Sequence, residues 1–167
     1  MKLENIDKAR FKKRLNRFQA ALVAGLLVLS LALSQIYTGL WGSGDSNTLL
    51  NLAAVVTSLF VLAGIMNLIK DKPWMYEIRY MRQLKAELNR IYRASRKLEQ
   101  ALEEDNPDAI VVKYFQLHGS RHLYQLEDNT LTLEELNRQI ADLDERIKQR
   151  GMQVSAEDYA PAMLDRL

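Results

Sequence analysis

The sequence of 167 residues contains no cysteine, and this absence excludes several classes of protein. A disulfide-stabilised scaffold, a cysteine zinc site, an iron–sulfur protein and a thiol nucleophile all need the missing residue type. A glycine-rich phosphate loop and a Ser-His-Asp arrangement are also missing, and no carboxylate is paired with a nucleophile. We therefore expect a protein that is not an enzyme, with no cofactor and no small-molecule substrate.

Charged side chains are missing from two long apolar stretches. Residues 18–41 and residues 49–69 contain no Asp, Glu, Lys or Arg. A helix rises about 1.5 Å per residue, so roughly 20 such residues cross a hydrocarbon core about 30 Å thick. We predict transmembrane helices over 18–41 and 49–69. Because neither contains an ionisable residue, the sequence argues against a pump or carrier built from this chain alone.

The link between these stretches, residues 42–48, lacks Lys and Arg, whereas both flanking segments are rich in them. Residues 1–17 contain seven cationic side chains and two carboxylates, and residues 70–97 contain nine and three. Lys and Arg are retained on the cytoplasmic side of a membrane. The pattern predicts a helical hairpin with both termini cytoplasmic and 42–48 as a short periplasmic loop.

Residues 1–17 form a predicted basic amphipathic arm on the cytoplasmic side. Phe11, Leu15 and Phe18 share one helical face, and cations lie between them. Such a helix binds a surface of anionic lipid headgroups. The basic side chains expected to face the lipid are Lys12, Lys13, Arg14 and Arg17.

Residues 73–150 are predicted to form cytoplasmic helices over 73–105, 107–127 and 132–150, followed by a tail at 151–167. Asn106 and Pro107 are a cap and a first helical residue, while Thr132 and Glu135 have the spacing of a capping box. Gly151 is a typical helix end. Gly119 weakens the middle helix. The short links favour an antiparallel bundle, so the fold class is all-α: a transmembrane hairpin, a long coiled-coil-like helix and two shorter antiparallel helices.

Apolar residues recur in heptad spacing along 73–105, with Glu77 and Ser95 as the exceptions. This spacing is typical of a coiled coil or a long bundle helix. We call the apolar positions the seam and predict that it is an interaction surface. The sequence leaves open whether its partner lies in the same chain, in a second copy or in another membrane protein. The seam consists of Trp74, Met81, Leu84, Leu88, Ile91, Leu98 and Leu102.

Two further groups of polar residues could bind a partner. His118 and His122 lie four residues apart, on one helical face, and are weak candidates for metal ligands, because no third ligand accompanies them. The basic residues Arg90, Arg93, Arg96 and Lys97 are expected to pair with acidic groups, either from the acidic segment 98–167 or from another protein. We do not expect nucleic acid as their partner.

The order of a basic arm, a tight hairpin and the segments MYEIRYMRQLKAELNRIY and YFQLHGSRHLYQLEDNTLTLEEL resembles a known family. These are small two-span bacterial inner-membrane proteins, mainly gammaproteobacterial, classed as a domain of unknown function. The resemblance implies a location in the inner membrane and no activity. We predict a membrane-anchored helical scaffold or accessory subunit that self-associates or binds a partner through its cytoplasmic helices. The alternatives are a regulatory subunit that contacts a transporter or channel through its spans, and a metal-binding protein at His118 and His122.

Overall fold

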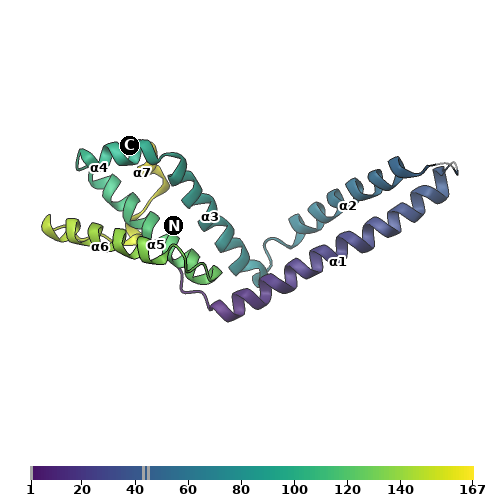
Figure 1. Ribbon diagram of the computed structural model, residues 1–167, viewed down its shortest axis with the longest axis horizontal. Coiled ribbons are helices and arrows are strands. Elements are labelled where there is room, and N and C mark those ends of the chain that lie inside the picture. Colours follow the sequence, from purple (N-terminus) through teal and green to yellow (C-terminus); the bar gives the residue numbers. More distant parts are fainter. Residues whose placement is uncertain (1, 43, 45) are drawn as a thin grey trace. The chain divides into compact units, whose positions relative to one another are not determined.

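The computed structural model describes residues 2–42, 44 and 46–167 (Figure 1). Within these residues the chain forms seven α-helices and two 3₁₀ helices, and no strand. This confirms the predicted all-α class. The chain divides into two compact units. We call residues 9–79 the hairpin unit, and residues 2–8 together with 80–167 the helical domain.

The hairpin unit consists of the two apolar helices α1 (Lys8–Trp41) and α2 (Thr48–Ile69), which pack as a hairpin (Figure 1). Both helices end at the last residue of an uncharged stretch, and α2 also begins within one residue of its stretch. Helix α1 begins ten residues before its stretch, within the predicted basic arm. Small side chains allow the two helices to approach each other. A Cβ on Gly25 would lie 3.5 Å from Leu62, and Ala54 and Ser58 are fully buried. Of the predicted loop at 42–48, residues 43 and 45 lie outside the described residues.

Polar side chains of the hairpin bond to one another or to backbone. Ser34 donates to Oδ1 of Asn51 at 2.5 Å, and the hydroxyls of Tyr37 and Thr57 lie 3.1 Å apart. Ser58 donates to the carbonyl of Ala54 at 2.7 Å. In an apolar setting these bonds remove the cost of leaving polar groups unpaired.

Residues 73–105 are predicted to form one helix, but in the structure they form three successive elements. A 3₁₀ turn η1 (Pro73–Met75) precedes α3 (Tyr76–Arg93), and a turn at Ala94 separates α3 from α4 (Ser95–Glu103). Helices α5 (Pro107–Glu127) and α6 (Leu133–Gln149) agree closely with the predicted ranges 107–127 and 132–150. The predicted tail, for which no helix is predicted, contains η2 (Ala156–Asp158) and α7 (Pro161–Arg166).

The ends of α5 and α6 test the helix caps predicted from the sequence. Asn106 caps α5, its side chain accepting the backbone N–H two residues on at 2.9 Å. Gly151 has a φ of +61°, the left-handed conformation that ends α6. The predicted capping box at Thr132 is wrong, because this side chain makes no capping hydrogen bond. The carboxylate of Glu135 instead binds Gln139 at 3.0 Å and Arg138 at 2.9 Å.

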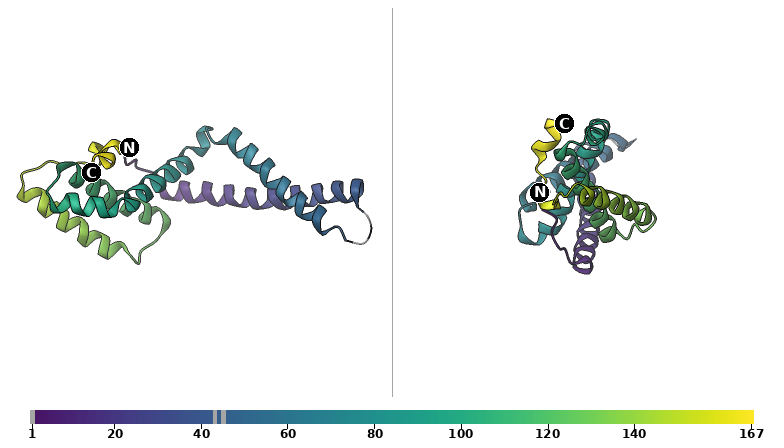
Figure 2. Two further views of the ribbon diagram at one scale, coloured as in Figure 1. Left: turned by 90° about the horizontal axis from the view of Figure 1, so that it is seen from above. Right: turned by 90° about the vertical axis from the view of Figure 1, so that its left-hand side faces the viewer.

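Helix α5 is the centre of the helical domain, and its neighbours cover several of its faces (Figure 2). Toward α6 it contributes Ile110 and Leu117 to one apolar cluster. Toward α3 it contributes Gly119, where a Cβ would lie 3.1 Å from Leu88 and 3.4 Å from Leu84. Gly119 therefore permits close packing of α3 on α5. The α6 residues of the cluster are Leu136, Ile140, Leu143 and Ile147.

Both ends of the chain pack onto the helical domain. The Tyr159 ring stacks on Phe115 of α5 with ring centres 4.1 Å apart, and Leu164 of α7 is buried. At the other end, the backbone N–H of Glu4 donates to the Tyr80 hydroxyl at 2.8 Å. Residues 2–8 thus belong to this domain, so the predicted arm at 1–17 is divided between the two units.

Candidate functional site

The seam lies mostly inside the helical domain. Met81, Leu84, Leu88, Ile91 and Leu98 are buried, with Leu84 and Ile91 at 0% exposure. In α3 the seam residues Leu84 and Leu88 pack on α5 at Gly119. The two outer positions differ. Leu102 is partly buried against the α5–α6 cluster, and Trp74 is 44% exposed in the hairpin unit, with its ring centre 6.4 Å from that of Phe18.

The two polar exceptions in the heptad pattern mark structural features. Ser95 is the first residue of α4, immediately after the turn at Ala94. Glu77 is buried in the hairpin unit, where its carboxylate lies 3.2 Å from the Arg10 guanidinium and 3.3 Å from that of Arg14. This carboxylate ties the start of α3 to the basic part of α1.

The basic arm residues therefore differ in their surroundings. Arg14, predicted to face lipid, contacts Glu77 and is only 30% exposed. Lys13 and Arg17 are exposed, and Lys12 is partly exposed. The structure thus leaves Lys13 and Arg17 as the more accessible cations of this group.

His118 and His122 lie on one face of α5, beside a hollow of about 270 Å³ that residues 3–5 help to line. Arg121 donates to Nδ1 of His118 at 3.2 Å, and the His118 ring stacks on Tyr114 with ring centres 4.1 Å apart. An Nδ1 that accepts a hydrogen bond belongs to an imidazole without a proton on that nitrogen. The Tyr80 and His122 ring centres lie 6.3 Å apart.

Burial lowers the pKa of both imidazoles below 6.5; for His118 the nearby Arg121 charge lowers the pKa further, and Asp144 opposes the shift. These histidines are therefore neutral at pH 7. Neutral imidazoles can ligate a metal, but two ligands do not make a closed site. Among the described residues, no group of three or more His, Asp or Glu side chains is placed to hold a metal ion.

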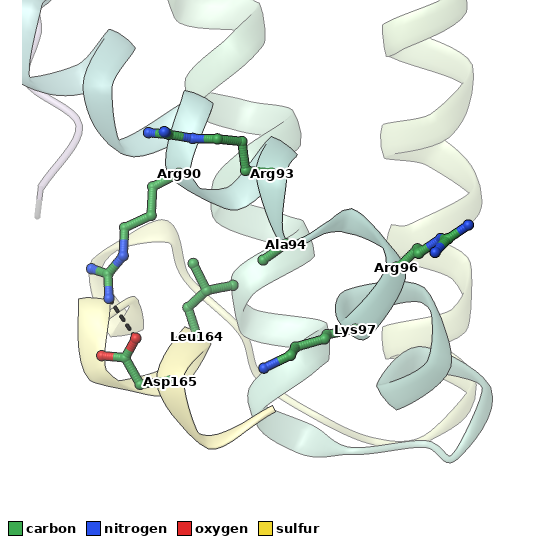
Figure 3. Close-up of a pocket in the computed structure, with 7 residues that line it drawn as sticks. All are labelled: Arg90, Arg93, Ala94, Arg96, Lys97, Leu164 and Asp165. Atoms are coloured by element: carbon green, nitrogen blue, oxygen red, sulfur yellow. Dashed lines mark hydrogen bonds and ion pairs between the residues drawn. The ribbon is translucent and has the colours of Figure 1, made fainter.

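A basic hollow of about 440 Å³ lies between α3, α4 and α7 (Figure 3). We call it the basic hollow. Only one of its four cations meets the acidic segment in an ion pair among the described residues: Arg90 donates to Asp165 at 2.6 Å. The other lining residues are Arg93, Ala94, Arg96, Lys97 and Leu164. The sequence signal for this site is the run of cations across the helix break, but its third wall comes from α7.

Comparison with known proteins places the chain in a family. Residues 1–164 match the family model described as "Protein of unknown function (DUF3087)". The chain belongs to this family. The match covers nearly the whole chain, hairpin unit and helical domain together, in agreement with the resemblance seen in the sequence. No curated protein and no solved structure matches this DUF3087 chain.

Proposed function

We propose that this protein is a membrane-anchored helical scaffold or accessory subunit, held in the bilayer by α1 and α2. The main support for this anchor is that the apolar side chains of α1 and α2 are exposed. The most apolar 18-residue windows of α1 and α2 are only 0% and 11% buried, whereas the core helix of a soluble protein is mostly buried. Leu31, Phe60 and Leu68 are 67%, 74% and 77% exposed. Removing one such side chain from water is worth about 1.5–3 kcal/mol.

The charge distribution supports an orientation for this anchor. Cations lie before the first uncharged stretch, in residues 1–17, and after the second, in residues 70–97, whereas the link at 42–48 has none. Because Lys and Arg are retained on the cytoplasmic side, the helical domain and both termini lie on the cytoplasmic side of a bacterial inner membrane. Lys13 and Arg17 are then placed to meet anionic headgroups.

The burial of the seam decides which surface remains for a partner. Self-association through Leu84, Leu88 or Ile91 would require α3 to leave α5, because these side chains form the core of the helical domain. A partner protein or a second copy therefore binds the outer surface of this domain. The exposed outer face of α3 includes Tyr92, which is 70% exposed.

A regulatory subunit that works through its spans has less support from this geometry. Ser34, Tyr37, Thr57 and Ser58 make hydrogen bonds within the hairpin, which leaves them fewer free donors and acceptors for another membrane protein. A metal-binding role has less support too, since His118 and His122 have no third ligand among the described residues.

Photo-crosslinking in native membranes separates these functions. A photoreactive phenylalanine analogue replaces either Tyr92 in the helical domain or Phe60 in α2, two exposed aromatic positions of similar exposure. We expect a protein adduct at Tyr92 and only lipid adducts at Phe60. A protein adduct confined to Phe60 would favour the regulatory subunit. Complete release of the protein from membranes by alkaline carbonate would refute the anchor.

A further inference from the structure

The cations of the basic hollow come together because the helix breaks at Ala94. Arg90 and Arg93 lie in the last turn of α3, and Arg96 and Lys97 lie in the first turn of α4. Arg90 and Arg93 share one face of α3 by their spacing of three residues, whereas the direction of Arg96 and Lys97 is set by the turn at Ala94. The same segment buries Ile91 and Leu98 on its other side, so the apolar contacts fix where the cations point.

The C-terminal helix α7 completes the hollow. Leu164 is buried and anchors α7, and Arg166 donates to Asp108 at 2.6 Å, which holds the helix from its far end. In Figure 3, Arg90 reaches Asp165 from one side and Lys97 extends toward Leu164 and Asp165 from the other, whereas Arg96 points away from α7. The hollow thus has a polar and an apolar part.

The charge of the basic hollow is unbalanced. Four cations face one lining carboxylate, and that carboxylate, Asp165, is already paired with Arg90. Glu87, 3.5 Å from the same guanidinium, also accepts a hydrogen bond from the Tyr159 hydroxyl, with the two oxygens 2.5 Å apart. In the part of the chain that the structure describes, Arg93, Arg96 and Lys97 make no ion pair. An excess of cations over carboxylates around one hollow creates a local positive potential that favours an anion.

We propose that the basic hollow binds the phosphate group of a phosphorylated organic molecule. Lys97 and Arg90, which approach the Leu164–Asp165 part of α7 from two sides (Figure 3), bind the phosphate oxygens, and Leu164 and Ala94 contact the organic part. Arginine matches phosphate geometry and lysine acts as a point charge, so both suit this ligand. A volume of about 440 Å³ is within the range of small-molecule sites. The ligand competes with Asp165 for Arg90, so the carboxylate of α7 limits its affinity. This site is independent of the membrane anchor proposed above.

The test uses the full-length protein in nanodiscs of neutral phosphatidylcholine and follows pyrophosphate binding by calorimetry. We expect saturable binding with one pyrophosphate per chain. Lys97→Gln should weaken it at least tenfold, and Lys97→Arg should restore most of it. Asp165→Asn should strengthen it about threefold by removing the competing carboxylate. The matched control is Arg82→Gln, an exposed cation of α3 that does not line the hollow, and this change should alter the affinity less than twofold.

A second arm identifies the source of the phosphate. Replacing part of the neutral lipid by phosphatidylglycerol lowers the pyrophosphate affinity of the wild-type protein and of Arg82→Gln equally if a lipid headgroup occupies the hollow. An unchanged affinity assigns the site to a soluble phosphorylated molecule. Absence of saturable binding at millimolar pyrophosphate, or equal losses in Lys97→Gln and Arg82→Gln, would overturn the proposal and leave an acidic protein surface as the partner of these cations.

Discussion

Replacing Leu84 by alanine tests whether the seam is covered within one chain. The Leu84 side chain has 0% exposure, and it packs where a Cβ on Gly119 would be only 3.4 Å away. A buried leucine truncated to alanine loses its transfer free energy and leaves a cavity, which together cost about 3 kcal/mol. For a domain of this size each kcal/mol lowers the melting temperature by about 4–8 °C, so we expect a decrease of roughly 15 °C.

The assay is thermal unfolding of the full-length protein in mild detergent, followed by circular dichroism at two protein concentrations a factor of ten apart. Leu131→Ala is the control, because Leu131 is 94% exposed, and its effect should stay within about 0.5 kcal/mol. Covering within one chain predicts a melting temperature independent of concentration. The reasoning is refuted if both variants have equal effects, or if the wild-type melting temperature rises with concentration as it does for an obligate dimer.

Three further changes probe other contacts. Gly119→Val should lower the free energy of unfolding by about 2 kcal/mol in urea titration, since even a Cβ would lie 3.1 Å from Leu88; an unchanged midpoint would contradict the close packing. Glu77→Gln should lower the free energy of unfolding by about 1–3 kcal/mol in the same titration, because two arginines lose their shared carboxylate. Equal stability of this variant and the wild type would contradict the pairing. Burial lowers the pKa of His118 and His122, so the unfolded chain binds protons more readily. Stability should therefore fall as the pH decreases through about 6.5, and replacing both histidines by glutamine should flatten that dependence.

The parts of the fold that could be predicted from sequence depend on local signals. The uncharged stretches end at Trp41 and Ile69, and α1 and α2 end at the same residues. Asn106 followed by Pro107 begins α5 in the structure, since a side-chain cap and a fixed φ act within one turn. Leu136, Ile140, Leu143 and Ile147 of α6 are buried together because their spacing of three and four residues places them on one helical face.

The features that could not be predicted depend on residues far apart in the chain. Glycine has a low helix propensity, so Gly119 predicts a weak helix on local grounds. Its packing role follows only from the position of α3, whose Leu88 and Leu84 lie against it. The basic hollow needs Asp165, 75 residues after Arg90. The turn at Ala94 has a local trace in Ser95, the polar residue of the heptad row, but a single polar position does not distinguish a helix break from a solvated site.

Site-directed labelling of cysteine tests the membrane-anchored hairpin most directly, because the natural chain has no cysteine to interfere. Ser46→Cys places a thiol in the link between α1 and α2, and Thr130→Cys places one in the link between α5 and α6; both positions are exposed. In intact cells, a membrane-impermeant maleimide should label the first variant and should reach the second only after permeabilisation. Labelling of Thr130→Cys in intact cells, with Ser46→Cys protected, would contradict the orientation, and protection of both until lysis would contradict the anchor itself.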